Sequence, residues 1–377
     1  MDVYLLPLMW MGLGLAVLML GGDLLVRGAS ALAILIGVTP LVIGLTVVAF
    51  GTSAPELAVT VGACFAGETD LAIGNVVGSS IFNVLCILGV AALVRPLAID
   101  AQLIRLDVPL MIASSVLLLA MGWDGSISRV DGGILFAMLL GYVGWSVYQG
   151  RRESARVRQE LEQHALETLP RHRSNAALQG ALILAGLGLL ALGSHWLVGA
   201  SVTLAESLGV SELLIGLTIV AVGTSLPEAA ASVMAAARGQ REIAVGNAVG
   251  SNIFNVLAVL GISALIAPGG IAVSEAALRF DIPVMIVVCM LCLPIFFTGG
   301  AITRREGALF VGYYLAYTTY LVLVAIQSGY ARLFGQSMLL VVFPLTLIGV
   351  LIGVFKALWR SRGTAASGSK SSSQDES

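Results

Sequence analysis

Two carboxylates, Glu56 and Glu228, lie inside long apolar segments, and each directly follows a proline in the sequence GTSxPE. Proline has no N–H, so a helix should open at Pro55 and Pro227. The opening is expected to free backbone carbonyls as ligands at Ala49, Thr52, Ala221 and Thr224. An ionised glutamate near the centre of a bilayer costs several kcal/mol, and these segments contain no Lys or Arg. A bound cation is therefore the predicted counter-charge.

A second polar motif follows each glutamate, GNVVGSSIFN at 74–83 and GNAVGSNIFN at 246–255. In each copy a serine and an asparagine stand four residues apart, so both project from one face of a helix. These residues are Ser79, Asn83, Ser251 and Asn255. Carboxylate, hydroxyl and amide oxygens without imidazole or thiolate predict a site for a hard cation such as Na⁺, Ca²⁺ or Mg²⁺. Asn75 and Asn247 also recur, and we interpret them as helix-packing residues.

The two motif pairs belong to an internal duplication. Residues 44–96 align with 216–268 without a gap at an offset of 172, and 30 of the 53 positions are identical. Each copy lies in a unit of five predicted spans, and five is odd, so the second unit should enter the membrane inverted relative to the first. Inverted repeats of this kind place a transport site near the midplane, where the two copies meet.

The composition requires a membrane protein. The chain has 377 residues, 58% of them hydrophobic and 11% charged, and a mean hydropathy of +0.97, which the surface of a water-soluble domain could not carry. Stretches long enough to span a membrane, about 20 apolar residues each, occur at 4–26, 37–64, 70–94, 104–123, 129–149, 176–199, 208–237, 242–267, 280–298, 306–327 and 337–358.

The predicted fold is an all-α integral membrane protein with two inverted five-helix repeats and one extra C-terminal transmembrane helix. The segments are a first unit (1–150), a cytoplasmic linker (151–175), a second, inverted unit (176–327), the extra helix (328–362) and a disordered Ser-rich cytoplasmic tail (363–377). The tail is polar and lacks the apolar residues that a packed core needs.

The positions of the basic residues predict the orientation. If 151–175 is cytoplasmic, 17 of the 20 Lys and Arg residues fall on the inner side, and only Arg129, Arg279 and Arg332 fall outside. This positive-inside pattern places the N-terminus outside and the C-terminus in the cytoplasm of a multi-pass protein of the inner (plasma) membrane. The net charge of −2 gives no indication of a nucleic-acid partner.

Other polar residues in the spans carry weaker signals. Asp107 and Asp281 precede prolines near span ends and are interpreted as helix starts. Asp23, His195 and Glu206 have no matched partner in the other repeat, so we expect solvated or packing roles. The four cysteines all lie in apolar spans, where no disulfide is expected.

With these motifs the chain resembles the cation/Ca²⁺ antiporter superfamily, specifically its prokaryotic sodium/calcium exchangers, over roughly residues 4–327. The resemblance implies exchange of Ca²⁺ for Na⁺ by alternating access, without a cofactor, with the lipid bilayer as the surroundings and the two ions as partners. It implies that Glu56 and Glu228 bind Ca²⁺ beside Thr52 and Thr224, and that Asn83 and Asn255 line the centre. Two mirrored Na⁺ sites would comprise Ala49, Ser53 and Ser79, and Ala221, Ser225 and Ser251.

Two features depart from this family's pattern. Some members carry Asp where this chain has Asn255, and a K⁺-dependent branch uses an acidic residue in this region, so K⁺ co-transport is not expected. The eleventh span lies outside the minimal plan. The sequence carries no indication of the oligomeric state.

Three alternatives stay open. In a Ca²⁺/H⁺ exchanger the same two glutamates would carry protons, although the serine hydroxyls beside them favour Na⁺. A cation channel would be expected to form its pore by oligomeric symmetry, whereas this single chain contains both halves of a site. A membrane hydrolase would need a nucleophile and a base, and the three histidines, His164, His172 and His195, lie in the linker or alone.

Overall fold

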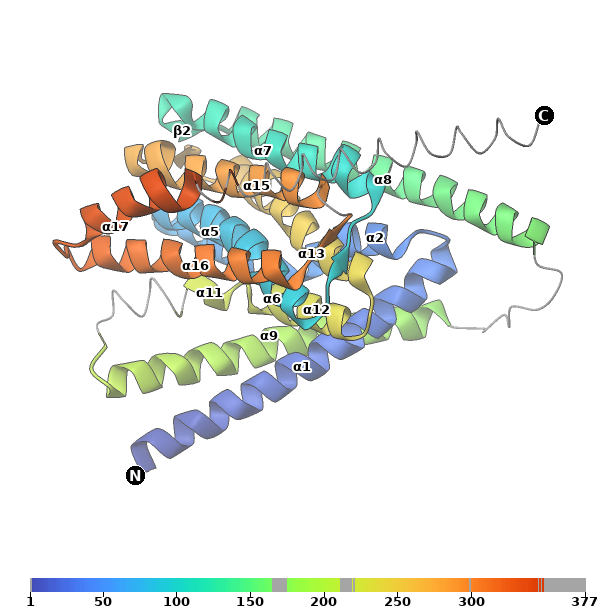
Figure 1. The fold of residues 1–377 in the computed structure, drawn as a ribbon, viewed down its shortest axis with the longest axis horizontal. Coiled ribbons are helices and arrows are strands. Elements are labelled where there is room, and N and C mark those ends of the chain that lie inside the picture. Colours follow the sequence, from blue (N-terminus) through green and yellow to red (C-terminus); the bar gives the residue numbers. More distant parts are fainter. Residues whose placement is uncertain are drawn as a thin grey trace, which may run out of the picture.

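The computed structural model describes residues 2–164, 175–210, 219, 221–297, 300–344, 346 and 348, which form an all-helical membrane protein with two short strand pairs (Figure 1). The elements of the first half are α1 (Asp2–Ile36), α2 (Pro40–Ile43), η1 (Gly44–Val48), α3 (Ala49–Thr52), α4 (Ala54–Ala66), α5 (Thr69–Phe82), η2 (Asn83–Leu88), α6 (Gly89–Val94), β1 (Leu97–Ala98), η3 (Leu103–Asp107), α7 (Val108–Met121), η4 (Gly122–Asp124), β2 (Ser126–Ile127) and α8 (Arg129–His164).

The second half repeats much of this order. Its elements are α9 (Ala176–Ser207), α11 (Ala221–Gly223), α12 (Leu226–Ala237), α13 (Arg241–Phe254), η6 (Asn255–Leu260), α14 (Gly261–Ile266), β3 (Ile271–Ala272), η7 (Ala277–Asp281), α15 (Ile282–Phe297), β4 (Ala301–Ile302), α16 (Arg304–Ala325), α17 (Ala331–Ser337) and η8 (Met338–Val342). The elements named η are π-helical turns, except the 3₁₀ turn η4.

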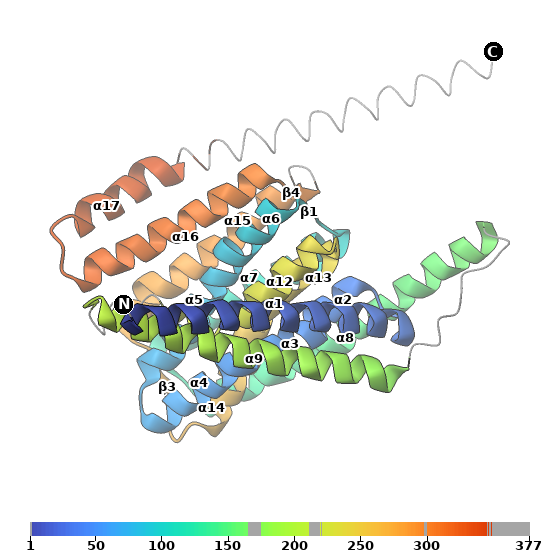
Figure 2. The ribbon, with the colours of Figure 1, turned by 90° about the horizontal axis from the view of Figure 1, so that it is seen from below.

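The described residues contain eight helices that are long and apolar enough to cross a membrane, and a ninth span formed by two helices with a bend of 44° between them. These nine correspond to nine of the eleven predicted spans. The predicted seventh span (208–237) and eleventh span (337–358) lie partly outside the described residues. Helix α8 continues past residue 150, the predicted end of the first unit, as one helix to His164 and projects beyond the bundle (Figure 2).

The centre of the bundle is formed by the two GNxxGSxIFN helices. The spans at 69–94 and 241–266 are largely enclosed by protein. In each span a regular helix ends at the motif's phenylalanine, and a π-helical turn begins at Asn83 or Asn255. Such turns interrupt regular helix geometry and occur often at functional sites.

Two antiparallel strand pairs join the halves of the chain at different levels. Leu97 of β1 pairs with Ile302 of β4, and Ile127 of β2 pairs with Ile271 of β3. Thus the connection between α6 and α7 meets the connection between α15 and α16, and the connection between α7 and α8 meets the one between α14 and α15. Each connection pairs with a non-equivalent connection of the other half.

Helices α1 and α9 run antiparallel in direct backbone contact, side by side in both views (Figures 1 and 2). A Cβ added to Gly21 would lie 2.7 Å from the Leu190 nitrogen and 2.9 Å from the Gly186 oxygen. A Cβ on Gly186 would lie 2.6 Å from the Leu25 nitrogen. Only glycine allows this approach, as at close helix contacts in membranes generally.

The C-terminal elements α17 and η8 fold back along α16 after the turn at Gln327, which has a φ of 53°. The Tyr313 hydroxyl of α16 donates a hydrogen bond of 2.6 Å to the Thr346 hydroxyl. Near the turn, a Cβ on Gly335 would lie 2.8 Å from the Tyr320 ring. This segment therefore packs on the outside of the bundle, away from the central helices.

We predict that Gly186→Leu lowers the melting temperature of the detergent-purified protein. The new side chain would meet backbone atoms of α1, and forcing a well-packed contact apart costs about 1–3 kcal/mol. Gly188→Leu on the same helix is the matched control, because nothing lies within 4 Å of a Cβ there. Equal melting temperatures for the two variants would contradict the close contact.

Candidate ion-binding site

Each GTSxPE motif forms a helix break that ends in a new helix N-terminus. The first break falls at Ser53 (φ −81°, ψ 7°), between α3 and α4, and the second falls at Ser225 (φ −89°, ψ 6°), before α12. The proline occupies the start of the new helix, where its missing N–H is tolerated. Glu56 and Glu228 then lie in the first turns of α4 and α12. There the positive end of the helix dipole favours a carboxylate.

The two breaks face each other, and each serine donates to the carboxylate of the other half. The Ser53 hydroxyl donates to Glu228 Oε1 at 3.0 Å, and the Ser225 hydroxyl donates to Glu56 Oε1 at 2.8 Å. A hydrogen bond of 2.9 Å also joins the hydroxyls of Ser225 and Ser79. Neither half of the chain completes this arrangement alone.

Both glutamates are enclosed and lack a counter-charge. Each side chain is 1% exposed. The second oxygen of each, Oε2, has no hydrogen-bond partner in the described part of the chain, and no ion pair there involves either residue. Burying two unpaired carboxylates is strongly unfavourable. The arrangement therefore suits a cation that binds between them.

Asn75 and Asn247, interpreted from sequence as packing residues, bridge the helices of the site. Asn75 Nδ2 donates to the Glu56 carbonyl (3.2 Å) and Thr60 (3.0 Å), and Thr224 donates to its Oδ1 (3.3 Å). Asn247 Nδ2 donates to the Glu228 carbonyl (3.1 Å) and Ser232 (2.8 Å), and Thr52 donates to its Oδ1 (3.2 Å). Each asparagine thus holds a carboxylate-bearing helix of its own half and a threonine of the other half. Both asparagines therefore have the helix-packing role that the sequence suggested, and they lie next to the residues that carry the carboxylates.

The remaining predicted residues are buried with polar atoms that have no partner among the described residues. These atoms are Asn83 Oδ1, Ser251 Oγ, Asn255 Oδ1 and Asn255 Nδ2. Ser251 is equivalent to Ser79, yet only Ser79 bonds to a serine of the opposite break. The two halves of the site therefore share residue types but differ in their hydrogen bonds.

One expectation about backbone ligands is not met in this conformation. The Ala49 carbonyl accepts the Ser53 N–H at 3.0 Å, so the break does not free it. Pro55 lacks the N–H that would reach Gly51, whereas the donor to Ala49 is Ser53, which closes α3. Ala221 begins α11, and its side chain lies outside the described part.

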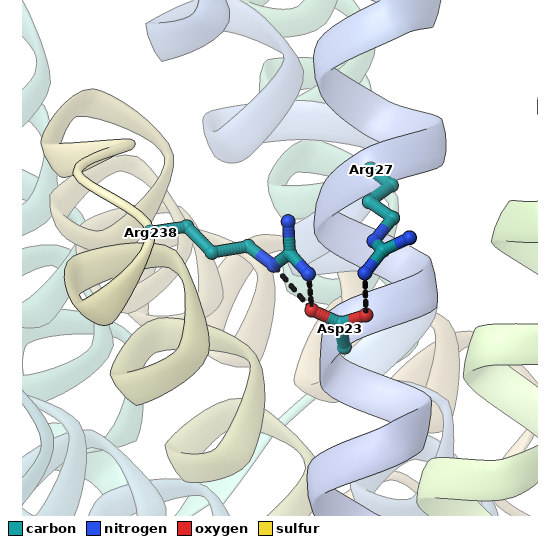
Figure 3. Close-up of polar contacts among 3 residues, drawn as sticks. All are labelled: Asp23, Arg27 and Arg238. Atoms are coloured by element: carbon teal, nitrogen blue, oxygen red, sulfur yellow. Dashed lines mark hydrogen bonds and ion pairs between the residues drawn. The ribbon is translucent and has the colours of Figure 1, made fainter.

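Asp23, expected to be a solvated or packing residue, forms an ion-pair network (Figure 3). It pairs with Arg27 on α1 at 2.9 Å and with Arg238 at the end of α12. The network joins α1 to the helix that carries Glu228. No sequence signal indicated it, because the two partners are 215 residues apart.

Asp107 is not the helix start that the sequence predicted: it ends η3 with helical backbone (φ −73°, ψ −44°), inside one continuous helix that begins before it. It is fully buried and accepts hydrogen bonds from Tyr142 (3.1 Å) and Gln102 (3.3 Å). These contacts fix α8 to the start of α7. Asp107 is thus satisfied within its own half and does not contact the two glutamates.

The donor set is rich in hydroxyl and amide oxygens and holds only two charges. No group of three or more His, Cys, Asp or Glu side chains gathers anywhere in the described ranges. Such a set suits the hard cations that prefer oxygen ligands, with Glu56 and Glu228 able to neutralise one divalent ion.

Comparison with known proteins gives consistent matches along most of the chain. The family profile described as Sodium/calcium exchanger protein matches residues 6–148 and 178–323. The inner membrane protein YrbG of Escherichia coli is 38% identical over 280 residues, covering 74% of this chain and 85% of that protein. The sodium/calcium exchanger MaX1 of Methanosarcina acetivorans is 33% identical over 335 residues, covering 81% and 95%.

Among solved structures, the sodium-calcium exchanger NCX_Mj matches with a TM-score of 0.70 and 28% identity, covering 84% of this chain and 99% of that one. Both halves of the chain match the family profile, and each half contains one copy of the motifs that form the site. This chain therefore belongs to the sodium/calcium exchanger family.

Proposed function

We propose that the chain is a secondary active antiporter that exchanges Ca²⁺ for Na⁺ across the membrane. The observation that carries the proposal is the pair of enclosed carboxylates, Glu56 and Glu228, each bonded to a serine of the other half and each with an unpartnered oxygen. Two negative charges match one Ca²⁺, and several Na⁺ ions could replace it. The names of MaX1 and NCX_Mj, both sodium/calcium exchangers, support the same pair of ions.

The proposed ligands divide into one Ca²⁺ site and two flanking Na⁺ sites. Glu56 and Glu228, with Thr52 and Thr224, would hold Ca²⁺. One Na⁺ site would comprise Ala49, Ser53 and Ser79, its mirror image Ala221, Ser225 and Ser251, and Asn83 and Asn255 would border the centre. The unpartnered oxygens of Ser251 and Asn83 support this division. To act as a ligand, the Ala49 carbonyl would have to bind Na⁺ either in addition to the hydrogen bond that it accepts from Ser53 or in place of that bond.

Two observations support inverted repeats. Helices α1 and α9, the first of each unit, run antiparallel. In the first unit α7 separates the connections that contain β1 and β2, and in the second unit α15 separates those that contain β3 and β4. The strand before α7 pairs with the strand after α15, and the strand after α7 pairs with the strand before α15. Such pairing is expected when one unit is upside down relative to the other. With the positive-inside pattern, we place the N-terminus outside and the C-terminus inside the plasma membrane.

Alternating access is supported by a contact that one unit makes and the other does not. A Cβ on Gly22 of α1 would lie 3.0 Å from the Ala230 oxygen and 3.1 Å from the Met234 side chain of α12. The residue equivalent to Met234 is Gly62 on α4, and nothing lies within 4 Å of a Cβ there. We infer that α1 closes the cytoplasmic side, and that α9 would close the outer side in the alternate state.

One further feature supports this state. The ion pair between Asp23 and Arg238 (Figure 3) lies at the end of α12 that the proposed orientation places on the cytoplasmic side. It joins α12 to α1 next to the close contact at Gly22.

The test of function is Ca²⁺ uptake into proteoliposomes of the purified chain. Vesicles loaded with Na⁺ and diluted into Na⁺-free medium containing Ca²⁺ are expected to accumulate Ca²⁺. Vesicles that have a pH gradient of equal size and contain no Na⁺ are not expected to accumulate Ca²⁺. Uptake driven by the pH gradient alone would contradict Na⁺ coupling and favour the Ca²⁺/H⁺ alternative.

Glu56→Gln and Glu228→Gln serve as matched variants in the same assay. Each removes one of the two charges that neutralise Ca²⁺ while keeping the shape of the side chain, so each is expected to abolish uptake in a folded protein. Exchange at near wild-type rate by either variant would contradict a shared site.

We predict that Arg238→Gln opens the cytoplasmic side. A cysteine at Met234, in a background that lacks the four native cysteines, reports access to the contact between α1 and α12. Loss of a partly exposed ion pair is worth up to about 1 kcal/mol, so labelling by an impermeant maleimide from the cytoplasmic side should rise about threefold to fivefold.

Arg27→Gln is the control for this experiment. Arg27 pairs with Asp23 within α1 and does not bridge to α12, so labelling should stay at the parent rate. Equal labelling in the Arg238→Gln protein and its parent would contradict a role of the Asp23–Arg238 ion pair in closing the cytoplasmic side.

A further inference from the structure

The amide side chains at the centre of the bundle form a relay between the two units. Asn252, in the second GNxxGSxIFN motif, is 2% exposed and contacts α5 of the first unit. Its Nδ2 donates to the Ser80 carbonyl at 3.1 Å, and its Oδ1 accepts from Asn83 Nδ2 at 3.0 Å. Asn252 thus connects a backbone carbonyl of α5 to a proposed ion-site residue at the start of η2.

The carbonyl decides the direction of every bond in this relay. A carbonyl can only accept, so the atom of Asn252 that faces Ser80 must be the NH₂ group. The weak acceptors Met111 Sδ (3.5 Å) and Cys289 Sγ (3.9 Å) lie around the same nitrogen. The other end of the amide, Oδ1, must then face Asn83 and can only accept. Asn83 is thereby obliged to present its own NH₂ group to Asn252.

The hydrogen bond to Asn252 fixes the orientation of the Asn83 amide and therefore the position of its Oδ1. With Nδ2 engaged, its Oδ1 is the end of the amide that stays free, and it is buried without a partner among the described residues. Asn83 stands four residues after Ser79, which joins the Ser225 and Glu56 cluster, so the two share a helix face. A cation needs the oxygen of an amide and is repelled by its NH₂ group.

Among the described residues, no equivalent hydrogen-bond chain orients Asn255, the counterpart of Asn83. The residue equivalent to Asn252 is Ser80, and its hydroxyl donates to the Val76 carbonyl of its own helix at 2.8 Å. Asn255, the counterpart of Asn83, has neither Nδ2 nor Oδ1 partnered among the described residues. Nothing in the contacts described there orients the Asn255 amide.

We propose that Asn252 is a positioning residue that orients the Asn83 amide so that its oxygen faces the transported cation. This proposal rests on the proposed function, in which Asn83 borders the ion site. It makes the two halves of the site unequal, because Asn83 offers a fixed ligand and Asn255 an adaptable one. Asn252 itself need not touch the ion.

The test is a double-mutant cycle on binding of radioactive Ca²⁺ to the purified full chain. Asn252→Ser introduces the residue that the first unit carries at the equivalent place. It removes the acceptor for Asn83 Nδ2, and the apparent Kd for Ca²⁺ should rise about fivefold, the change expected for one net hydrogen bond. Ser80→Ala is the matched control and should change the Kd less than twofold, because the carbonyl that Asn252 uses remains.

The second arm of the cycle separates orientation from packing. The Asn83→Asp side chain carries two oxygens, so it presents an oxygen to the cation in either orientation. When Asn252 is still present, the other carboxylate oxygen faces Asn252 Oδ1, which is unfavourable because neither atom can donate. In the Asn83→Asp background, Asn252→Ser should therefore leave Ca²⁺ affinity unchanged or improve it. The same loss of affinity in both backgrounds would mean that Asn252 only packs, and would overturn the proposal. So would complete loss of Ca²⁺ binding in Asn83→Asp.

The outcomes distinguish this proposal from the function on which it rests. Failure of the wild-type chain to bind Ca²⁺ would contradict the proposed function itself. Wild-type binding with an unchanged Kd in Asn252→Ser would overturn only the role of Asn252. If Asn252→Ser does not fold, Asn252→Ala removes the same acceptor, and the same pair of Kd values decides the question.

Discussion

Two carboxylates enclosed in a membrane protein without a basic partner repel each other and lose the solvation that would stabilise their charges. Most features of the centre reduce this cost. The helix breaks place Glu56 and Glu228 at helix N-termini, and the opposing serines donate to one oxygen of each. One oxygen of each glutamate still lacks a partner among the described residues. Within the proposed function, a bound cation completes the site, and its absence would hinder passage through an occluded state.

The duplication provides the geometry that such a site requires. Because Ser53 serves Glu228 and Ser225 serves Glu56, the site exists only where the two units meet. Asn75 and Asn247 tie these helices together by equivalent bonds. The outer helices α1 and α9 contact each other through backbone at glycines, so the first helices of the two units pack closely as a pair.

The sequence predicted the features that the two repeats share. The helix breaks followed from proline chemistry, and the grouping of Glu56, Glu228 and the motif serines followed from matched positions in apolar segments. Because the sequence analysis relied on matched positions, it did not identify the contacts of residues that differ between the repeats. Asp23 is equivalent to His195, and Asn252 to Ser80, so neither stood out as repeated. Their contacts depend on how α1 meets α12 and how α5 meets α13, which local periodicity does not determine. The ligand roles of the predicted site residues stay predictions.

The proposed function requires that Ca²⁺ and Na⁺ compete for one site between the two carboxylates. Isothermal titration of Ca²⁺ into the purified chain at a series of fixed Na⁺ concentrations measures this competition. We expect a single Ca²⁺ per chain and an apparent affinity that falls continuously as Na⁺ rises. A Ca²⁺ affinity that does not change with Na⁺ would contradict it.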